Sequence, residues 1–329
     1  MRLGSTVRRG LLPAVALLAM LATALTPARA QSDYPNRPIH LVVGFAAGGG
    51  NDIFARLVGA KLSDILGQSV VVENKPGAGG RLAPEYVTQQ AADGYTLFVG
   101  PSGAMAIAAA IFPDLKYSPT KSFVPLAMIA HFPLILVVAQ DNPATNLKEF
   151  VAWMKAHPDK ANYASSSPAF TIATELLKLK SGMPGTMIPY KGSGEMVLSV
   201  IQGQTAMTIA DGPPTVPQVK AGKVKALAVT GNERSAELPD VPSMTEAGYP
   251  EVNVQLWSGI FAPAATPAPI VAKLQKALGQ AIADPAVSDK LKAMAVNPGG
   301  ATPEQFERLI QSDIASYSEV VKAAKLKFE

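Results

Sequence analysis

Cysteine is missing from all 329 residues of the chain. No disulfide bond can form, and both cysteine nucleophiles and cysteine-ligated metals are excluded. A chain of this length buries enough apolar surface to fold without covalent cross-links, and the length favours two domains over one. The three histidines, His40, His131 and His157, lie far apart in the sequence and make a poor metal set, so packing or capping roles are expected for them.

The usual motifs of nucleotide-binding and hydrolytic enzymes are also missing. Gly77 and Gly79 begin a G-x-G-x-x-G pattern, but Leu82 occupies its last position. Neither a P-loop nor a G-x-S-x-G nucleophile elbow occurs. Asp52 and Asp211 are residues of the type that work as acid and base, although Asp52 matches a helix cap better. The sequence therefore predicts a protein that is not an enzyme and has no cofactor and no metal site.

The first thirty residues have the pattern of a secretory signal peptide. Three arginines precede an apolar run at 11–25, and the small residues Ala28 and Ala30 flank a cleavage position. A membrane anchor is the alternative, but Pro13 and Thr23 interrupt the run, which is shorter than the roughly 20 residues of a span. We expect cleavage after Ala30 and export to the periplasm, by ordinary secretion rather than by the folded-protein route.

Removal of this segment changes the charge of the protein. The whole chain is formally +4, but residues 1–30 contain four arginines and no acid, so 29 − 4 leaves 25 basic against 25 acidic side chains. A neutral mature chain, with no cluster of basic and aromatic residues, gives no indication of nucleic-acid binding.

The first part of the mature chain alternates short apolar runs with helical patterns. Strands are expected at 39–43, 70–72 and 95–99, and helices at 52–65, closed by Gly67, and at 82–90. This β-α-β-α-β order is typical of a parallel sheet with helices on both faces.

The second part of the chain repeats the pattern. Strands are expected at 163–165, 187–190, 206–210 and 224–229, and helices at 150–156 and 171–179. Asn146 and Glu149 have the spacing of a capping box, and two further helices are expected to start at Thr266-Pro267 and at Thr302-Pro303.

Five loops rich in glycine, serine and alanine follow the expected strands, at 45–52, 77–80, 100–104, 165–171 and 190–194. In an open parallel sheet, ligands bind at the carboxyl ends of the strands, where loops lead into helix N-termini. Small residues let backbone N–H groups approach a ligand, and helix N-termini favour negative charge. In any single loop, the glycines could be present merely because a tight turn requires them. Several such loops at one sheet edge, however, indicate an anion site.

Several motifs together resemble one family. They are Tyr34-Pro35-Asn36-Arg37-Pro38-Ile39, the 45–56 segment, Val72-Glu73-Asn74-Lys75-Pro76-Gly77-Ala78-Gly79-Gly80, Asp93-Gly94-Tyr95-Thr96-Leu97, Pro189-Tyr190-Lys191-Gly192, and 219–229. Across essentially the whole mature chain, the sequence resembles the substrate-binding proteins of tripartite tricarboxylate transporters, the Bug-type receptors. The resemblance implies an α/β, two-lobed type II periplasmic-binding-protein (Venus flytrap) fold, with parallel-type sheets flanked by helices.

The same resemblance implies how the domains and the site are arranged. Residues 31–131 and 257–329 would form the first lobe and 132–256 the second. The implied ligand contacts are Phe45, Ala46, Ala47, Gly48, Gly49, Gly50, Asn51, Asp52, Pro101, Ser102 and Ala104 in the first lobe, and Ser165, Ser166, Ser167, Tyr190 and Asp211 in the second.

The resemblance also implies the partners. A monomer would capture a small organic carboxylate, a dicarboxylate, tricarboxylate or aromatic acid, and deliver it to inner-membrane transporter subunits. Two alternatives remain open from the sequence. One is a ligand-binding partner of a membrane sensor kinase. The other is a periplasmic hydrolase, although the missing nucleophile motifs count against it.

Overall fold

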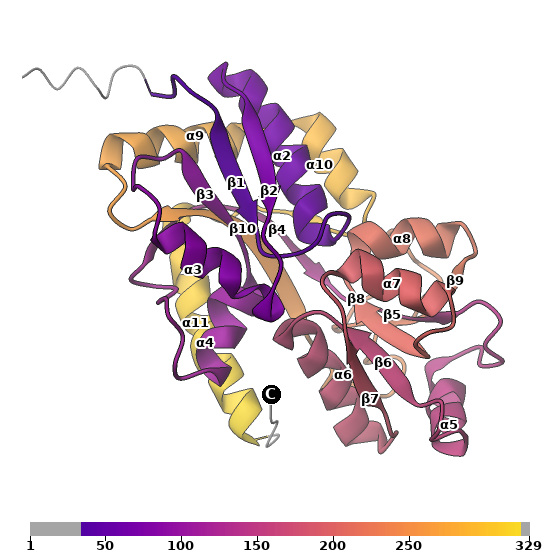
Figure 1. Cartoon of the computed structure of the whole chain (residues 1–329). Coiled ribbons are helices and arrows are strands. Elements are labelled where there is room, and N and C mark those ends of the chain that lie inside the picture. Colours follow the sequence, from indigo (N-terminus) through magenta and orange to yellow (C-terminus); the bar gives the residue numbers. More distant parts are fainter. Residues whose placement is uncertain (1–33, 324–329) are drawn as a thin grey trace, which may run out of the picture. The chain divides into compact units, whose positions relative to one another are not determined.

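The computed structural model describes residues 34–323, and residues 37–323 belong to one unit (Figure 1). The predicted signal peptide and its cleavage site lie outside the described residues. Two β-sheets, each flanked by helices, make up the unit; we call the six-stranded sheet with its helices the first lobe and the five-stranded sheet with its helices the second lobe. None of the helices within 34–323 has the length and apolar character that a bilayer crossing requires.

The first lobe has the strand order β11-β4-β10-β3-β1-β2. Strands β1 (Ile39–Val43), β2 (Val70–Asn74) and β3 (Thr96–Pro101) are parallel, as predicted. Strands β4 (Phe123–Pro133), β10 (Gln255–Pro263) and β11 (Asn297–Pro298) are antiparallel to their neighbours.

Helices cover both faces of the first sheet (Figure 1). One group consists of α2 (Gly50–Leu66), α9 (Ala268–Ala283) and α10 (Pro285–Lys292), which contact one another. The other consists of α3 (Leu82–Thr88), α4 (Ala108–Ile111) and α11 (Pro303–Ala323), with two short turns, η2 (Ala78–Gly80) and η3 (Gly103–Ile107). Beneath this second group Phe98, Phe123, Phe261 and Phe306 form a buried aromatic cluster that fixes α11 against the sheet.

The second lobe has the strand order β7-β6-β8-β5-β9. The strands are β5 (Ile135–Ala139), β6 (Asn162–Ser165), β7 (Thr186–Pro189), β8 (Met207–Ala210) and β9 (Val224–Val229). The flanking helices are α5 (Leu147–Ala156), α6 (Pro168–Ser181), α7 (Ser193–Ile201) and α8 (Gly212–Lys220). Strand β6 is parallel to β7 and β8, whereas β5 is antiparallel to β8 and β9.

The two connections between the lobes run through antiparallel strands. These strands, together with the short antiparallel strand β11, make both sheets mixed. Strand β4 ends at Pro133, and after Leu134 the chain enters β5 in the second lobe. The return connection enters the first lobe at Gln255, which pairs with Pro133. These connections lie near the boundaries expected at 131/132 and 256/257, but which residues move as one body stays a prediction.

Thr230 joins the two connections by hydrogen bonds. Its hydroxyl accepts from the Leu134 N–H at 2.7 Å and donates to the Val254 carbonyl at 2.6 Å. Its backbone N–H also donates to the Leu134 carbonyl at 2.8 Å. The side chain is fully buried, so each of these polar groups has its partner away from water.

Several helix ends follow the local signals in the sequence. The Glu149 N–H donates to the Asn146 side chain, Thr302 and Gln305 bond reciprocally, and Gly67 closes α2 with a left-handed backbone. The start of α2 differs from expectation: Gly49, not Asp52, is the N-cap, and Asp52 lies in the first turn with its carboxylate accepting from the Gly48 N–H at 3.0 Å.

Candidate functional site

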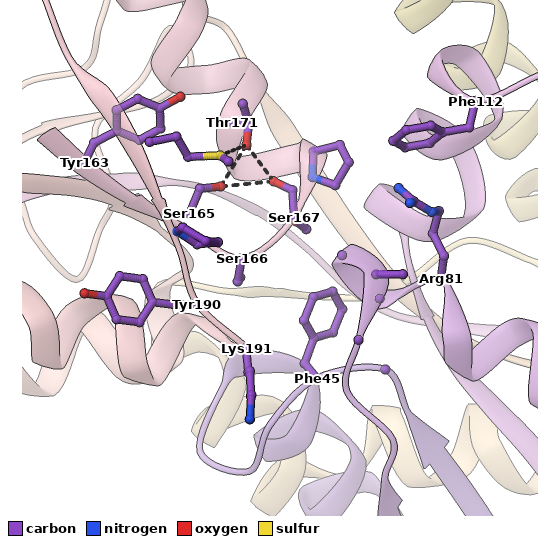
Figure 2. Close-up of a pocket in the computed structure, with 18 of the residues that line it drawn as sticks. Phe45, Arg81, Phe112, Tyr163, Ser165, Ser166, Ser167, Thr171, Tyr190 and Lys191 are labelled. Atoms are coloured by element: carbon purple, nitrogen blue, oxygen red, sulfur yellow. Dashed lines mark hydrogen bonds between the residues drawn. The ribbon is translucent and has the colours of Figure 1, made fainter. Parts of the chain in front are cut away.

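A cavity of about 700 Å³ lies between the carboxyl ends of strands from both lobes (Figure 2). The first lobe contributes the residues that follow β1 and β2, together with Phe112 at the end of α4. The second lobe contributes the end of β6, the first turns of α6, and β7 with the two residues after it. This volume is in the range of small-molecule sites.

Three serines at the end of β6 form the polar centre of the second-lobe wall. The Ser165 hydroxyl is hydrogen-bonded to the Thr171 hydroxyl at 2.8 Å, and both hydroxyls contact the Ser167 carbonyl, as Figure 2 shows. The Ser166 hydroxyl oxygen is buried and has no hydrogen-bond partner among the described residues. Because an unpaired buried hydroxyl is costly, Ser166 is suited to bond a ligand in the cavity.

Helix α6 begins at this wall. Ser167 is its N-cap but makes no side-chain cap bond, and Pro168 at the first helical position has no N–H to offer. The fourteen-residue helix therefore presents its partially positive end to the cavity without a protein carboxylate at the cap. Such an end favours an anionic group of a ligand.

The opposite wall is the loop 77–80, whose backbone conformation is unusual. All four residues have positive φ: Gly77 147°, Ala78 47°, Gly79 62° and Gly80 91°. A side chain at Gly80 would meet the Phe45 ring at 2.6 Å, and one at Gly79 would lie 3.1 Å from Pro168 of the second lobe. The loop can approach both neighbours only because these positions are glycine.

Five of the sixteen predicted contacts line the cavity: Phe45, Ser165, Ser166, Ser167 and Tyr190. The other eleven predicted residues do not line this cavity. Which residues touch a ligand stays a prediction for the whole set.

The loop 46–50 contacts the second lobe directly. The Ala46 N–H donates to the Lys191 carbonyl at 3.0 Å, and the Gly50 N–H donates to the Ser193 hydroxyl at 3.2 Å. A Cβ atom at Gly50 would lie 2.1 Å from a carboxylate oxygen of Asp211, and one at Gly194 would lie 2.7 Å from the Gly48 carbonyl. The glycines of this loop therefore allow the two lobes to touch.

Asn51 and Asp52 are buried and are hydrogen-bonded within the first lobe. Asn51 accepts from the Ser258 hydroxyl at 2.7 Å. Asp52 accepts from Arg56, from Asn74 and from the Gly48 N–H. Burial would raise the pKa of Asp52, but these three hydrogen bonds outweigh it, so the pKa is lowered and the carboxylate stays ionised. Both side chains fix the loop before α2.

Pro101, Ser102 and Ala104 are also buried near the end of β3. The Ser102 hydroxyl accepts from the Trp257 N–H at 3.3 Å, and the Ala104 carbonyl accepts from the Tyr117 hydroxyl at 2.7 Å. Next to them, a Cβ at Gly103 would lie 3.2 Å from Ala169 in α6, so this segment too packs against the second lobe.

Asp211, the N-cap residue of α8, is 1% exposed. Burial raises its pKa to about 6, against a hydrogen bond from Ser193 that lowers it, and its Oδ1 atom has no partner among the described residues. Because Ser193 also accepts from Gly50, the carboxyl group belongs to the contact between the lobes.

Several lining residues were not predicted from the sequence. The loop 77–80 was recognised as glycine-rich, and Ser167-Pro168 carried a helix-start signal. Arg81, Phe112, Thr171 and Glu175 gave no local signal, because only the folded chain brings them to the cavity. Within 34–323, no group of three or more acidic or histidine side chains is placed to hold a metal ion.

Comparison with known proteins identifies the family. Residues 54–326 match the sequence model described as the tripartite tricarboxylate transporter family receptor. The protein BugT of Bordetella pertussis is 36% identical over 313 residues, covering 93% of this chain and 96% of BugT.

Solved structures of similar proteins support the same family. MatC of Rhodopseudomonas palustris, with bound malate, is 35% identical with a TM-score of 0.84, covering 88% of this chain and 100% of that one. A second R. palustris protein, solved with adipate, is 33% identical with a TM-score of 0.86, covering 90% and 99%. Both the resemblance and the two-lobed fold expected from it are confirmed, and the chain belongs to the tripartite tricarboxylate transporter receptor family.

Proposed function

We propose that this chain is a periplasmic receptor that captures a small organic carboxylate in the cavity between its lobes and delivers it to a tripartite membrane transporter. The relatives solved with malate and with adipate support a carboxylate as the class of ligand. The observation that carries the proposal is the Ser166 hydroxyl, which has no hydrogen-bond partner within residues 34–323 and lies beside the N-terminal end of α6. Both features suit an acid group.

Binding requires the cavity to open and close. One wall of the cavity comes from each lobe. The lobes would rotate about the connections at Leu134 and Val254. Closure would bring 46–50 against Ser193 and Asp211 and surround the ligand. The receptor would act as a monomer and release the acid unchanged, without catalysis.

The mature protein would begin at Gln31, after cleavage behind Ala30. Mass spectrometry of the exported protein tests this, and a retained 1–30 segment would contradict it.

A thermal-shift screen of the mature chain against small carboxylates and neutral sugars tests the binding proposal. A cognate acid at about one hundred times its dissociation constant should stabilise the fold by roughly 2.7 kcal/mol. Ser166→Ala should weaken binding of that acid about tenfold while keeping the unliganded melting temperature. Ser288→Ala, at a half-buried position in α10 outside the cavity, is the control and should change neither. A response to sugars and to no acid would contradict the proposal.

A further inference from the structure

Arg81 is a cation held at the wall of the cavity. It follows the loop 77–80 directly and precedes α3, so its backbone position is set by that loop. Its guanidinium carbon lies 3.7 Å from the centre of the Phe112 ring, and both side chains line the cavity (Figure 2). Stacking on an aromatic ring orients a guanidinium group and leaves its N–H edge available to a carboxylate.

No group among residues 34–323 neutralises this cation. Among the described residues, Arg81 forms no ion pair, and its guanidinium donates no side-chain hydrogen bond. Glu85, one helical turn further along, is the carboxylate nearest in sequence and does not pair with it. A half-buried arginine without a carboxylate partner, at the wall of a cavity, is suited to pair with an anion from outside the protein.

The other charged side chains of the cavity wall do not neutralise the positive charge of Arg81. Glu175 already accepts from the Tyr163 hydroxyl at 2.6 Å and from the Lys178 ammonium at 2.7 Å, so its charge is balanced within the second lobe. Lys191 is exposed, and in Figure 2 it points away from the three serines. The cavity therefore has an excess of positive charge, and Arg81 is its half-buried source.

Arg81 and the three serines lie on different parts of the wall. The serines lie at and directly after the end of β6 in the second lobe, whereas Arg81 and Phe112 come from the first lobe. Figure 2 places Arg81 and Tyr163 on opposite sides of the serines, so the Arg81 side is the one remote from the carboxylate of Glu175. An acid group bonded to Ser166 leaves the Arg81 guanidinium for a second group of the same ligand.

We propose that Arg81 recognises a second carboxylate, so that the ligand is a dicarboxylate bound with one acid group at Ser166 and the other at Arg81. Phe112 is a positioning residue that holds the guanidinium plane. The inference rests on the proposed function and narrows its class of ligand, because a monocarboxylate of equal length leaves Arg81 unpaired.

Matched acids test this selectivity. Isothermal titration of the mature chain should compare butyrate with succinate, hexanoate with adipate, and octanoate with suberate. The diacid should bind better than its monoacid in at least one pair. Arg81→Gln should weaken that diacid about 10- to 100-fold and change its monoacid by less than about threefold, so the preference disappears.

Three further variants separate this role from general electrostatics and from folding. Lys191→Gln removes the same charge at an exposed position and should keep the diacid preference within about twofold. Arg81→Lys keeps the charge without the planar fork and should lose part of the preference. Phe112→Leu should also lose part of it, with the unliganded melting temperature serving as the check on folding.

Several outcomes would contradict the proposed role of Arg81. Equal weakening of monoacid and diacid by Arg81→Gln, an equal effect of Lys191→Gln, or a wild type that prefers monoacids would overturn the role of Arg81 while leaving carboxylate capture intact. A wild type that binds none of the six acids would overturn both this inference and the proposed function.

Discussion

The two glycine-rich loops of the first lobe look alike in sequence and are used differently. The loop 46–50 makes hydrogen bonds and close contacts with the second lobe at Lys191, Ser193 and Asp211. The loop 77–80 lines the cavity with a backbone of positive φ throughout. In the first loop the glycines allow close contact with the second lobe. In the second loop they allow a special backbone conformation beside the cavity, as well as the approach of Gly79 to Pro168.

The two loops therefore need glycine for different reasons, namely space in the first and backbone conformation in the second. In the first loop, the helical position Gly50 has ordinary backbone angles and lacks only space for a side chain. In the second loop, the conformation itself demands glycine, and Ala78 adopts it at a cost. Substitutions in the first loop should therefore affect closure, and those in the second should affect the stability of the loop.

Gly50→Ala should give the largest effect. Its Cβ would lie 2.1 Å from a carboxylate oxygen of the buried Asp211, so the carboxylate or the loop would have to shift before the lobes could make this contact. Ligand affinity should fall at least about 100-fold, roughly 3 kcal/mol, measured by titration with the acid found in the thermal-shift screen. The unliganded melting temperature should not fall, because alanine is favourable in a helix.

Gly279→Ala is the matched control for this substitution. Gly279 lies in α9, where an added Cβ meets nothing within 4 Å. It should bind the acid normally and gain about 0.5–1 kcal/mol of stability. Normal affinity in Gly50→Ala would show that closure does not need this contact.

Asp211→Asn tests the same contact through pH. The pKa of Asp211 is raised from 3.8 to about 6, so between these values the folded protein holds more protons than the unfolded chain. Stability from this group is therefore present below about pH 4, is lost as pH rises to about 6, and is constant above. Asparagine, which stays neutral, should make the variant roughly 3 kcal/mol more stable than wild type at pH 7, and most of this difference should be gone at pH 4.

Denaturant unfolding at pH 4, 5, 6 and 7 measures this difference. Other carboxyl groups titrate in both proteins, so their contributions cancel. Parallel stability curves for the two proteins would show that Asp211 is already hydrated and charged in the folded state.

Ala78→Gly should give the smallest effect and the opposite sign from most alanine-to-glycine changes. Ala78 has a φ of 47°, which costs an alanine about 1 kcal/mol and costs glycine little. Because glycine also loses more chain entropy on folding, we expect a net gain of no more than about 0.5 kcal/mol. A loss of about 1 kcal/mol in the free energy of unfolding would mean that the Ala78 methyl group has packing contacts that outweigh the strain.

Much of the fold could be predicted from the sequence because its signals are local. Strand β1 and strand β9 have the predicted bounds, and the Asn146 and Thr302 caps form as their spacing indicates. Helix α6 begins at Pro168, three residues before the predicted start, although the Ser167-Pro168 pair marks that start. The antiparallel direction of β4 and β10 depends on how the chain passes between lobes, which short-range patterns do not encode.

The site was harder to predict for the same reason. Glycine content cannot distinguish a loop that lines the cavity, such as 77–80, from one that does not, such as 46–50. The stacking of Arg81 on Phe112 joins residues from separate elements, and nothing near either residue indicates it. Ser166 was predicted, but its missing hydrogen bond becomes visible only when its neighbours are in place.

Thr230 has a mechanical consequence for the receptor. Its hydroxyl group accepts from the Leu134 N–H of the outgoing connection and donates to the Val254 carbonyl of the returning one. The positions of the two connections are therefore coupled. Neither connection can bend far without displacing the oxygen that the other also uses. We therefore expect the two connections to move together, and a substitution in either connection to change the bending stiffness of both.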